Sequence, residues 1–511
     1  MAESRSIIIL VTIGLYLAGM IGIGIRFSNT NKSTSDFYLG GRKLGPLVTA
    51  MSAEASDMSA YLLMGLPGVA LLAGVPEAVW TAIGLAVGTY LNWLFVARPI
   101  RQYSNHINAT TVPEFFSKRY HDEKHLLSLI AALVIVVFFI PYTASGFNAC
   151  GTLFSSLFGV DYFTAMIVSA LVITLYTTLG GFLAASTSDF IQSVVMTIAL
   201  IIVIFFGINA AGGWSAVVSN AQSMPGYLNL TQGYDAATGT ASSYNALTIV
   251  STLAWGLGYF GMPHILLRFM AIKDPKKLTT SRRVASIWVV ISMGVAVLIG
   301  IVGNAMISAG AIEELSSSDS QRIIIKIAEL ISTKGILPAI IAGIILAGIM
   351  AATMSTADSQ LLAAASSVSQ DIVRDTLGIR LSDKTSIIIA RCTVVLISVI
   401  AMFQARSEGS VFTIVSFAWA GFGAAFGPVV LLALFWRKSN KWGALTGMIA
   451  GGAMVFIWKY GVRPMGGLLD IYELLPAFLI AIVIDIVVSL ATGEPEKSVL
   501  KEFDEVAAIK D

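Results

Sequence analysis

The segment AEASDMSAYLLMGLPGVALLAG, residues 53–74, is a long apolar run that carries Asp57. A charged side chain inside a membrane costs about 3 kcal/mol on insertion scales. Around Asp57 lie residues that allow a helix to unwind and turn its backbone carbonyls inward: Ser56, Ser59, Gly65 and Pro67. An anion, free carbonyls and hydroxyls at mid-membrane form a cage for a small hard cation. The segment therefore predicts ion-coupled transport.

The composition places the chain among polytopic membrane proteins. Of its 511 residues, 56% are hydrophobic and 12% are charged, and the mean hydropathy is +0.81. Soluble domains carry about 25% charged residues. The two cysteines lie in apolar stretches, which argues against a disulfide framework, and the net charge of +2 gives no indication of a nucleic-acid partner. The first apolar run lacks a basic start and a cleavage site, so we expect a retained helix.

Apolar stretches of about 20 residues can span a bilayer as helices, and the chain contains thirteen. They lie near residues 7–25, 45–74, 76–97, 126–157, 161–184, 187–211, 244–271, 284–310, 336–370, 386–405, 409–436, 442–461 and 471–492. We therefore expect an all-α fold in one transmembrane domain, residues 1–493, followed by a short tail, residues 494–511. Residues 311–333 mix charges with an apolar stripe and predict an amphipathic helix outside the membrane, over the site.

The distribution of basic residues predicts the orientation in the membrane. Lysines and arginines follow five of the odd-numbered spans, whereas the polar loop 212–243 contains none. Cytoplasmic loops carry an excess of both residues. We therefore expect the loop and the N-terminus outside the cell and the C-terminus in the cytoplasm.

A second broken segment, STLAWGLGYFGMPHILLRFM, covers residues 251–270. Three glycines and Pro263 interrupt an aromatic-rich apolar helix there. The two broken helices, the second and seventh spans, lie five spans apart. This spacing predicts two five-helix units of opposite topology, residues 45–211 and 244–436, with a substrate site near mid-membrane where the broken helices meet.

A third polar constellation lies in the ninth span, in GIMAATMSTADSQLLAAASS, residues 348–367. Ser355 and Thr356 offer adjacent hydroxyls, and small neighbours allow close packing against another helix. Oxygen ligands of this kind suit Na⁺. Asp358 and Ser359 lie one turn further along, and Asp189 begins the sixth span near the cytoplasmic side.

Several long stretches of the chain resemble the solute:sodium symporter family, in particular its sodium/proline branch. They are ASDMSAYLLMGLPG, AWGLGYFGMPHILLRFMA, MSTADSQLL, FAWAGFGAAFGPVVLLALFW and FYLGGRKLGP. The resemblance covers nearly the whole chain. It implies a LeuT-like, five-plus-five inverted-repeat fold with one helix before the repeats and two after them.

The resemblance implies a sodium site between the second and ninth spans. Its ligands at matching positions are three backbone carbonyls and two hydroxyls: Ala55, Met58, Ala352, Ser355 and Thr356. It further implies that Asp57 is essential for sodium-dependent binding and that Ser59 lies close to both ion and substrate.

The resemblance also implies a substrate pocket and an activity. The pocket residues at matching or neighbouring positions are Ser56, Ala60, Tyr61, Tyr142, Trp255, Tyr259, Met262 and Pro263. Aromatic faces can pack a pyrrolidine ring, while unwound backbone amides and hydroxyls hold its carboxylate. The implied activity is sodium-driven import of L-proline, or of a closely related small amino acid, across the plasma membrane by alternating access, with no obligate protein partner.

The chain departs from the usual pattern of this branch and leaves alternatives open. Glu54 and Ala60 stand where glycines are usual, Tyr61 where tryptophan is usual, and Met262 where glutamine is usual, so a different small organic solute is possible. Asp358, with Asp189 and Ser359, suggests a second sodium site as in some relatives. A proton-coupled carrier with Asp57 or Glu54 as the relay, and a membrane sensor, are further readings. The broken helices contain no H-E-x-x-H or G-x-S-x-G motif, so we do not expect an enzyme.

Overall fold

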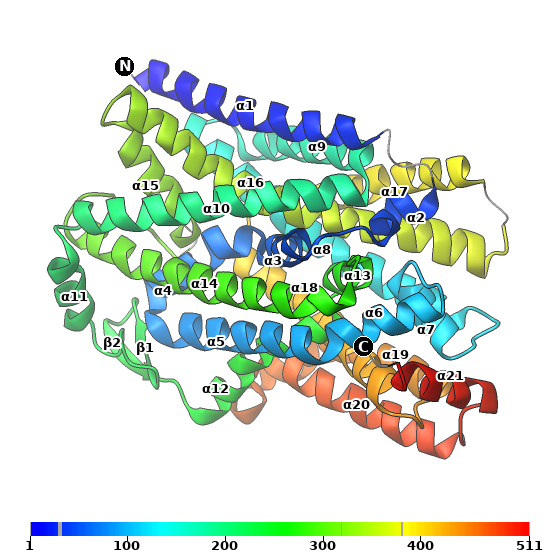
Figure 1. The fold of residues 1–511 in the computed structure, drawn as a ribbon. Coiled ribbons are helices and arrows are strands. Elements are labelled where there is room, and N and C mark those ends of the chain that lie inside the picture. The colour runs from blue at the N-terminus through cyan, green and yellow to red at the C-terminus, as the bar shows by residue number, and fades with distance from the viewer. Residues whose placement is uncertain (1, 29–32, 318, 380–381, 510–511) are drawn as a thin grey trace.

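The fold is a bundle of long apolar helices that lie roughly side by side (Figure 1). The computed structural model describes residues 2–28, 33–317, 319–379 and 382–509. Within these ranges, twelve helical segments are long and apolar enough to cross a membrane. They are α1 (Ala2–Ser28), α3–η2–α4 (Pro46–Ala60, Tyr61–Gly65, Leu66–Ala73), α5–η3–α6 (Val75–Leu91, Asn92–Val96, Ala97–His106), α8 (Leu126–Phe158), α9 (Tyr162–Gly180), α10 (Phe182–Ala210), α14 (Leu278–Ser308), α16 (Ile336–Ser366), α17 (Asp383–Gln404), α18 (Val411–Phe435), α19 (Lys441–Ile457) and α20 (Leu474–Ala491).

The predicted span at residues 244–271 is divided into three pieces. It consists of α12 (Ala246–Leu253), the 3₁₀ segment η4 (Ala254–Gly261) and α13 (Pro263–Ala271). Met262 between the last two is extended, with φ −75° and ψ 110°, because the residue before a proline avoids the helical region. The thirteen predicted spans thus correspond to twelve long helices and this divided segment, so helix length does not confirm the count of thirteen.

The shorter elements lie at the two ends of the bundle (Figure 1). α11 (Trp214–Ser223), α15 (Ile323–Ser332) and the antiparallel pair β1 (Gln232–Asp235) and β2 (Thr240–Ser243) gather at one end, and α2 (Thr34–Leu39), α7 (Val112–Arg119) and α21 (Lys497–Ala507) lie toward the other. The prediction of a helix over residues 311–333 is wrong for residues 311–317, which are not helical. In the second half, the apolar stripe of α15 is buried against the bundle, because isoleucine side chains pack better there than in water.

Two helices form the centre of the bundle. The apolar windows of α3–η2–α4 and α18 are 89% and 83% buried, against 22% for α1 at the periphery. A helix surrounded by other helices can expose a polar group to a protein cavity instead of to lipid. The centre is therefore where a broken helix can be tolerated.

Glycines bring the divided segment into backbone contact with α5. A Cβ added to Gly256 would lie 2.2 Å from the carbonyl oxygen of Gly84, and one added to Gly88 would lie 2.3 Å from the carbonyl oxygen of Gly256. Small residues permit this close approach of two helices. The contact fixes η4 beside α5 and opposite α3.

Candidate functional site

The helix α3 is broken at Ser59. This residue has φ 50° and ψ −171°, a conformation that non-glycine residues rarely adopt and that costs of order 1–3 kcal/mol. The Ser59 hydroxyl accepts the backbone N–H of Tyr61 at 3.1 Å, and a π-helical turn, η2, follows. The break interrupts the helical hydrogen bonds at the middle of the bundle, as the serines, glycine and proline of this segment predicted.

Hydroxyls of α16 lie against the turn of α3 that precedes the break. The Ser355 hydroxyl donates to the carbonyl oxygens of Ala55 (2.8 Å) and Ala352 (3.2 Å), and the Thr356 hydroxyl donates to that of Ala352 (3.1 Å). Four of the five expected sodium ligands are therefore brought together. The fifth residue, Met58, is buried in the same turn, and its carbonyl accepts the N–H of Tyr61.

The chemistry of these oxygens fits a sodium ion. All of them are uncharged carbonyls and hydroxyls, and the carbonyls of α3 lie at the C-terminal end of a half-helix, where the helix dipole favours a cation. Among the described residues, no group of three or more His, Cys, Asp or Glu side chains could hold a metal ion. A site of neutral oxygens favours a weakly bound monovalent cation over a transition metal.

Asp57 connects the break in α3 to two other elements. Its carboxylate oxygen Oδ2 accepts the Tyr259 hydroxyl of η4 at 2.5 Å, and its backbone carbonyl accepts the Tyr142 hydroxyl of α8 at 3.1 Å. Its other carboxylate oxygen, Oδ1, is buried and has no hydrogen-bond partner among the described residues. Asp57 therefore presents one unpaired acceptor beside the expected ion site.

Asp57 also lines a small internal cavity, here called the inner cavity. Its volume is ≈10 Å³, enough for about one water molecule. It is lined by Asp57, Met58, Tyr61, Leu85, Tyr142, Trp255, Met293, Val415 and Trp419. An amino acid fits there only if side chains move, so solute binding requires a rearrangement of this lining.

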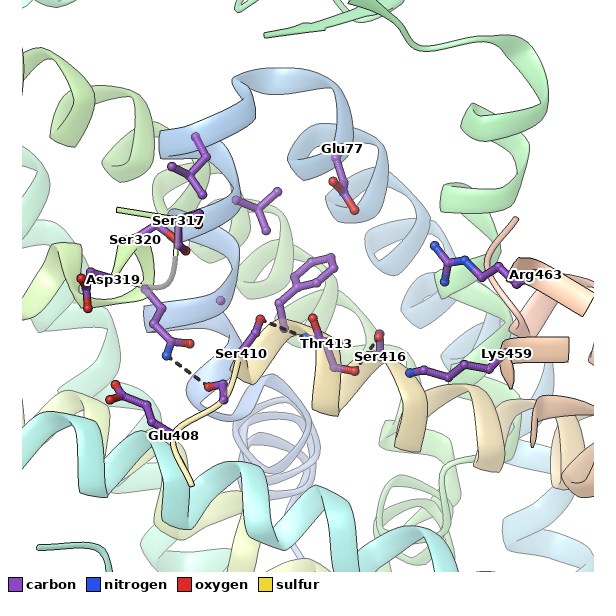
Figure 2. Close-up of a pocket in the computed structure, with 16 residues that line it drawn as sticks. Glu77, Ser317, Asp319, Ser320, Glu408, Ser410, Thr413, Ser416, Lys459 and Arg463 are labelled. Atoms are coloured by element: carbon purple, nitrogen blue, oxygen red, sulfur yellow. Dashed lines mark hydrogen bonds between the residues drawn. The ribbon is translucent and has the colours of Figure 1, made fainter. Parts of the chain in front are cut away.

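A much larger cavity, here called the vestibule, opens at one end of the bundle (Figure 2). Its volume is ≈700 Å³. Figure 2 shows Asp319 and Glu408 on one side of it and Lys459 and Arg463 on the other. Phe412 also lines the vestibule.

Aromatic rings separate the vestibule from the inner cavity. The ring of Phe412 packs against those of Tyr61 and Trp255, with centroids 5.6 Å and 5.5 Å apart, and the Tyr61 and Trp255 rings stack at 5.5 Å. Tyr61 and Trp255 face the inner cavity. These three rings form a lid that must open for a solute to pass.

The residues of the expected second sodium site also meet, around Arg268 of α13. Its guanidinium donates to Asp189 Oδ2 (3.0 Å) and to the Ser359 hydroxyl (2.5 Å), which in turn donates to Asp358 Oδ1 (3.1 Å). All four residues are buried. Asp189 Oδ1 and Asp358 Oδ2 have no hydrogen-bond partner among the described residues. Two carboxylates thus face one guanidinium.

Several expected pocket residues lie apart from the inner cavity. Ser56 donates back to the carbonyl of Ala53 at 3.0 Å, and Tyr259 contacts the lining residues Asp57 and Trp419 but does not line the cavity itself. The remaining expected residues are buried but absent from its lining: Ala60, Met262 and Pro263.

Glu54 points away from the lining as well. Its Oε1 accepts the Trp93 indole N–H (2.8 Å) and the Thr89 hydroxyl (3.1 Å). It therefore joins α3 to α5 and η3.

Sequence reasoning missed the part of the lining that comes from α5, α14 and α18. Leu85, Met293 and Val415 are ordinary apolar residues, and no local pattern distinguishes them from lipid-facing ones. Trp419 could have been found, because it lies in the glycine-rich stretch FAWAGFG. Its indole N–H donates to the Trp255 carbonyl at 2.7 Å, which fixes α18 against η4.

Comparisons with known proteins agree with this geometry. The sequence pattern described as "Sodium:solute symporter family" matches residues 37–451. The chain is 39% identical to the osmoregulated proline transporter OpuE of Bacillus subtilis (strain 168), over 98% of both chains, and 40% identical to the sodium/proline symporter of Haemophilus influenzae, over 97% of both.

A solved structure shows the same fold. A Na⁺-coupled sialic acid symporter, described in a substrate-bound outward-open state, superposes with a TM-score of 0.78. The alignment covers 96% of this chain and 99% of the symporter at 17% identity. It confirms the fold class that the resemblance implied.

Proposed function

Because the chain belongs to the sodium:solute symporter family, we propose that it imports L-proline, or a closely related small amino acid, together with sodium by alternating access. The observation that carries the proposal is the contact of the Ser355 hydroxyl of α16 with the carbonyl of Ala55, in the broken helix that also carries Asp57, whose Oδ1 has no hydrogen-bond partner among the described residues. This arrangement joins an ion site and a solute site through a single helix turn.

The ion contributes a positive charge beside Asp57. The residues that would hold it are Ala55, Met58 and Ala352 through their carbonyls and Ser355 and Thr356 through their hydroxyls. Sodium binds first and orders the broken turn, which brings Asp57 and Ser59 into position for the solute. The cost of unwinding α3 is then offset only when the ion is present, which is the basis of coupling.

The lining of the inner cavity favours a proline-like solute. Of the positions at which the chain departs from the usual pattern of the branch, only Tyr61 lines the cavity; Glu54, Ala60 and Met262 do not. Tyr61, Tyr142, Trp255 and Trp419 supply aromatic faces for a ring. Of these departures from the usual pattern, only Tyr61 therefore changes the immediate surroundings of a bound solute.

The vestibule is assigned to the extracellular side, with the N-terminus outside and the C-terminus in the cytoplasm of a plasma membrane. The loop 212–243, without lysine or arginine, lies at the same end of the bundle as α15 (Figure 1). The driving force is adequate. One charge crossing 100 mV supplies about 2.3 kcal/mol, and a tenfold sodium gradient adds about 1.4 kcal/mol, which together support accumulation of several hundredfold.

A second ion at Asp189, Asp358 and Ser359 is part of the proposal. The carboxyl groups of Asp189 and Asp358 lie around the one guanidinium of Arg268, and among the described residues one oxygen of each has no hydrogen-bond partner. Sodium dependence of uptake measured for wild type and Asp358→Asn tests this. If two ions bind, uptake depends sigmoidally on sodium concentration in wild type and hyperbolically in Asp358→Asn. A hyperbolic dependence in both proteins would contradict a second ion.

The direct test of the proposed function is radiolabelled proline uptake into proteoliposomes with an inward sodium gradient. A matched potassium gradient is the ionic control, and Asp57→Ala is compared with Asp383→Ala, which changes an exposed acid at the start of α17. The proposal predicts sodium-dependent accumulation in wild type and Asp383→Ala and none in Asp57→Ala. Equal uptake with sodium and potassium would contradict sodium coupling, and sodium-driven uptake of another solute alone would contradict proline.

A further inference from the structure

Two of the residues that line the inner cavity, Asp57 and Tyr61, carry buried polar atoms. Asp57 Oδ1 and the Tyr61 hydroxyl are both buried and both lack a hydrogen-bond partner among the described residues. A buried polar group without a partner costs about 1–3 kcal/mol. The first atom can accept a hydrogen bond from an ammonium group, and the second can donate one to a carboxylate. Together they match the two charged ends of an amino acid.

Three aliphatic side chains of the lining, here called the apolar wall, are Leu85, Met293 and Val415. These side chains come from three helices, α5, α14 and α18, and each is at most 3% exposed. None of them carries a polar atom that can hydrogen-bond strongly.

Close helix contacts hold the apolar wall in place. Gly88 of α5, three residues beyond Leu85, contacts the backbone of Gly256. Gly300 of α14, two turns beyond Met293 on the same face, would place a Cβ 2.4 Å from the carbonyl oxygen of Pro67 in α4. These two helices therefore cannot withdraw from the cavity without breaking glycine contacts.

We propose that the apolar wall sets the specificity of the carrier: Leu85, Met293 and Val415 accept the methylene groups of a small cyclic amino acid and reject solutes that place a polar group or a longer chain against them. The inference rests on the proposed function and names the feature that selects its substrate. Asp57 and Tyr61 hold the charged ends of the amino acid, and its ring contacts the apolar wall as well as the aromatic faces of the lining.

Two kinds of competitor probe the wall separately. Pipecolate has one more ring methylene than proline, and an extra methylene changes affinity about 10- to 200-fold in a fitted apolar pocket. 4-Hydroxyproline adds a hydroxyl, which an apolar pocket rejects by about 100-fold. The wall predicts that both bind more weakly than proline by these factors.

The experiment measures sodium-dependent binding of radiolabelled proline to the full-length protein in proteoliposomes and its displacement by each competitor. The readout is the ratio of each competitor's dissociation constant to that of proline. Met293→Ala enlarges the wall, because methionine is replaced by a much smaller side chain. The matched control is Met306→Ala, which shortens a buried methionine of the same helix away from the cavity. Val415→Thr keeps the shape of the wall and adds a hydroxyl.

Met293→Ala lowers the pipecolate ratio at least about tenfold and leaves the hydroxyproline ratio unchanged. Val415→Thr lowers the hydroxyproline ratio about tenfold and leaves the pipecolate ratio unchanged. Met306→Ala changes neither ratio. If the pipecolate and hydroxyproline ratios are each the same in wild type and in the three variants, the proposal is overturned.

Wild type decides the question even if a variant does not fold. If it binds 4-hydroxyproline or pipecolate as tightly as proline, the wall does not select. Failure of the proposed function is a separate result, because wild type then shows no sodium-dependent proline binding at all.

Discussion

Ser355→Ala removes one hydroxyl from the expected sodium site and changes little else. The Ser355 hydroxyl makes two contacts, 2.8 Å to the carbonyl of Ala55 in α3 and 3.2 Å to that of Ala352 in its own helix. Ser366 provides a matched control. It is also buried on α16 and donates to the carbonyl three residues earlier, at 2.8 Å, but it has no contact with α3 in the hydrogen-bond network.

The expected magnitude follows from the ligand set. The hydroxyl is one of the five oxygens that we propose as ligands of the ion, and a hydrogen-bond-strength interaction with a charged group contributes about 1.5–3 kcal/mol. Since about 1.4 kcal/mol corresponds to a factor of ten, Ser355→Ala weakens sodium affinity about 10- to 150-fold. Ser366→Ala lies about 16 Å further along the helix and leaves sodium affinity within about twofold.

The assay is proline uptake at saturating proline over a range of sodium concentrations, for both variants and wild type. Ser355→Ala raises the sodium concentration at half-maximal uptake by the factor above, and uptake returns when sodium is raised further. A Ser355→Ala protein with the wild-type sodium dependence would refute the placement of the ion between α3 and α16.

Three other substitutions test the packing and electrostatics around the site. Gly258→Ala places a Cβ 2.0 Å from the indole nitrogen of Trp419, so we expect it to destabilise the protein by about 1–3 kcal/mol and to reduce proline binding in melting and binding assays. Gly294→Ala has neither effect, because among the described residues no atom beyond its own helix backbone and chain neighbours lies within 4 Å of the added Cβ. Arg268→Ala leaves a buried carboxylate unpaired and lowers stability by about 3–5 kcal/mol, which a thermal melt in detergent detects. Burial raises the pKa of Glu114, but its ion pair with Lys118 and hydrogen bonds from Thr110 outweigh burial and lower the pKa below its ordinary value. The ion pair therefore stabilises the protein at pH values above the ordinary pKa of a glutamate. This stabilisation is lost as the pH falls through the pKa of Glu114 in the folded state. Melting temperatures between neutral and acidic pH then fall less steeply for Glu114→Gln than for wild type.

The parts of the site that break helices could be predicted from sequence. Asp57, the surrounding serines and Pro67 are conspicuous in an apolar run, because polar and helix-breaking residues are costly there without a function. The hydroxyls of Ser355 and Thr356 were predicted as ligands by resemblance, and the structure places the Ser355 hydroxyl against the carbonyl of Ala55 and the Thr356 hydroxyl against that of Ala352.

The other residues of the site could not be predicted from the sequence, because their positions depend on contacts between distant segments. Leu85 and Met293 line the inner cavity only because glycine contacts fix their helices at one distance from the broken turns. Nothing in the local pattern separates such residues from lipid-facing ones, since lipid and cavity are both apolar. The position of Arg268 between Asp189 and Asp358 could not be predicted from the sequence either, because the three side chains come from three different helices.

The measurement that tests the central claim most directly is equilibrium binding of radiolabelled proline to the purified protein in sodium and in potassium at equal ionic strength. Ion and solute sites that share the broken turn of α3 must be thermodynamically coupled, and the coupling must be reciprocal. The account predicts that sodium tightens proline binding about 5- to 150-fold, the range typical of coupled sites, and that proline tightens sodium binding by the same factor. Proline binding of equal affinity in sodium and potassium would contradict it.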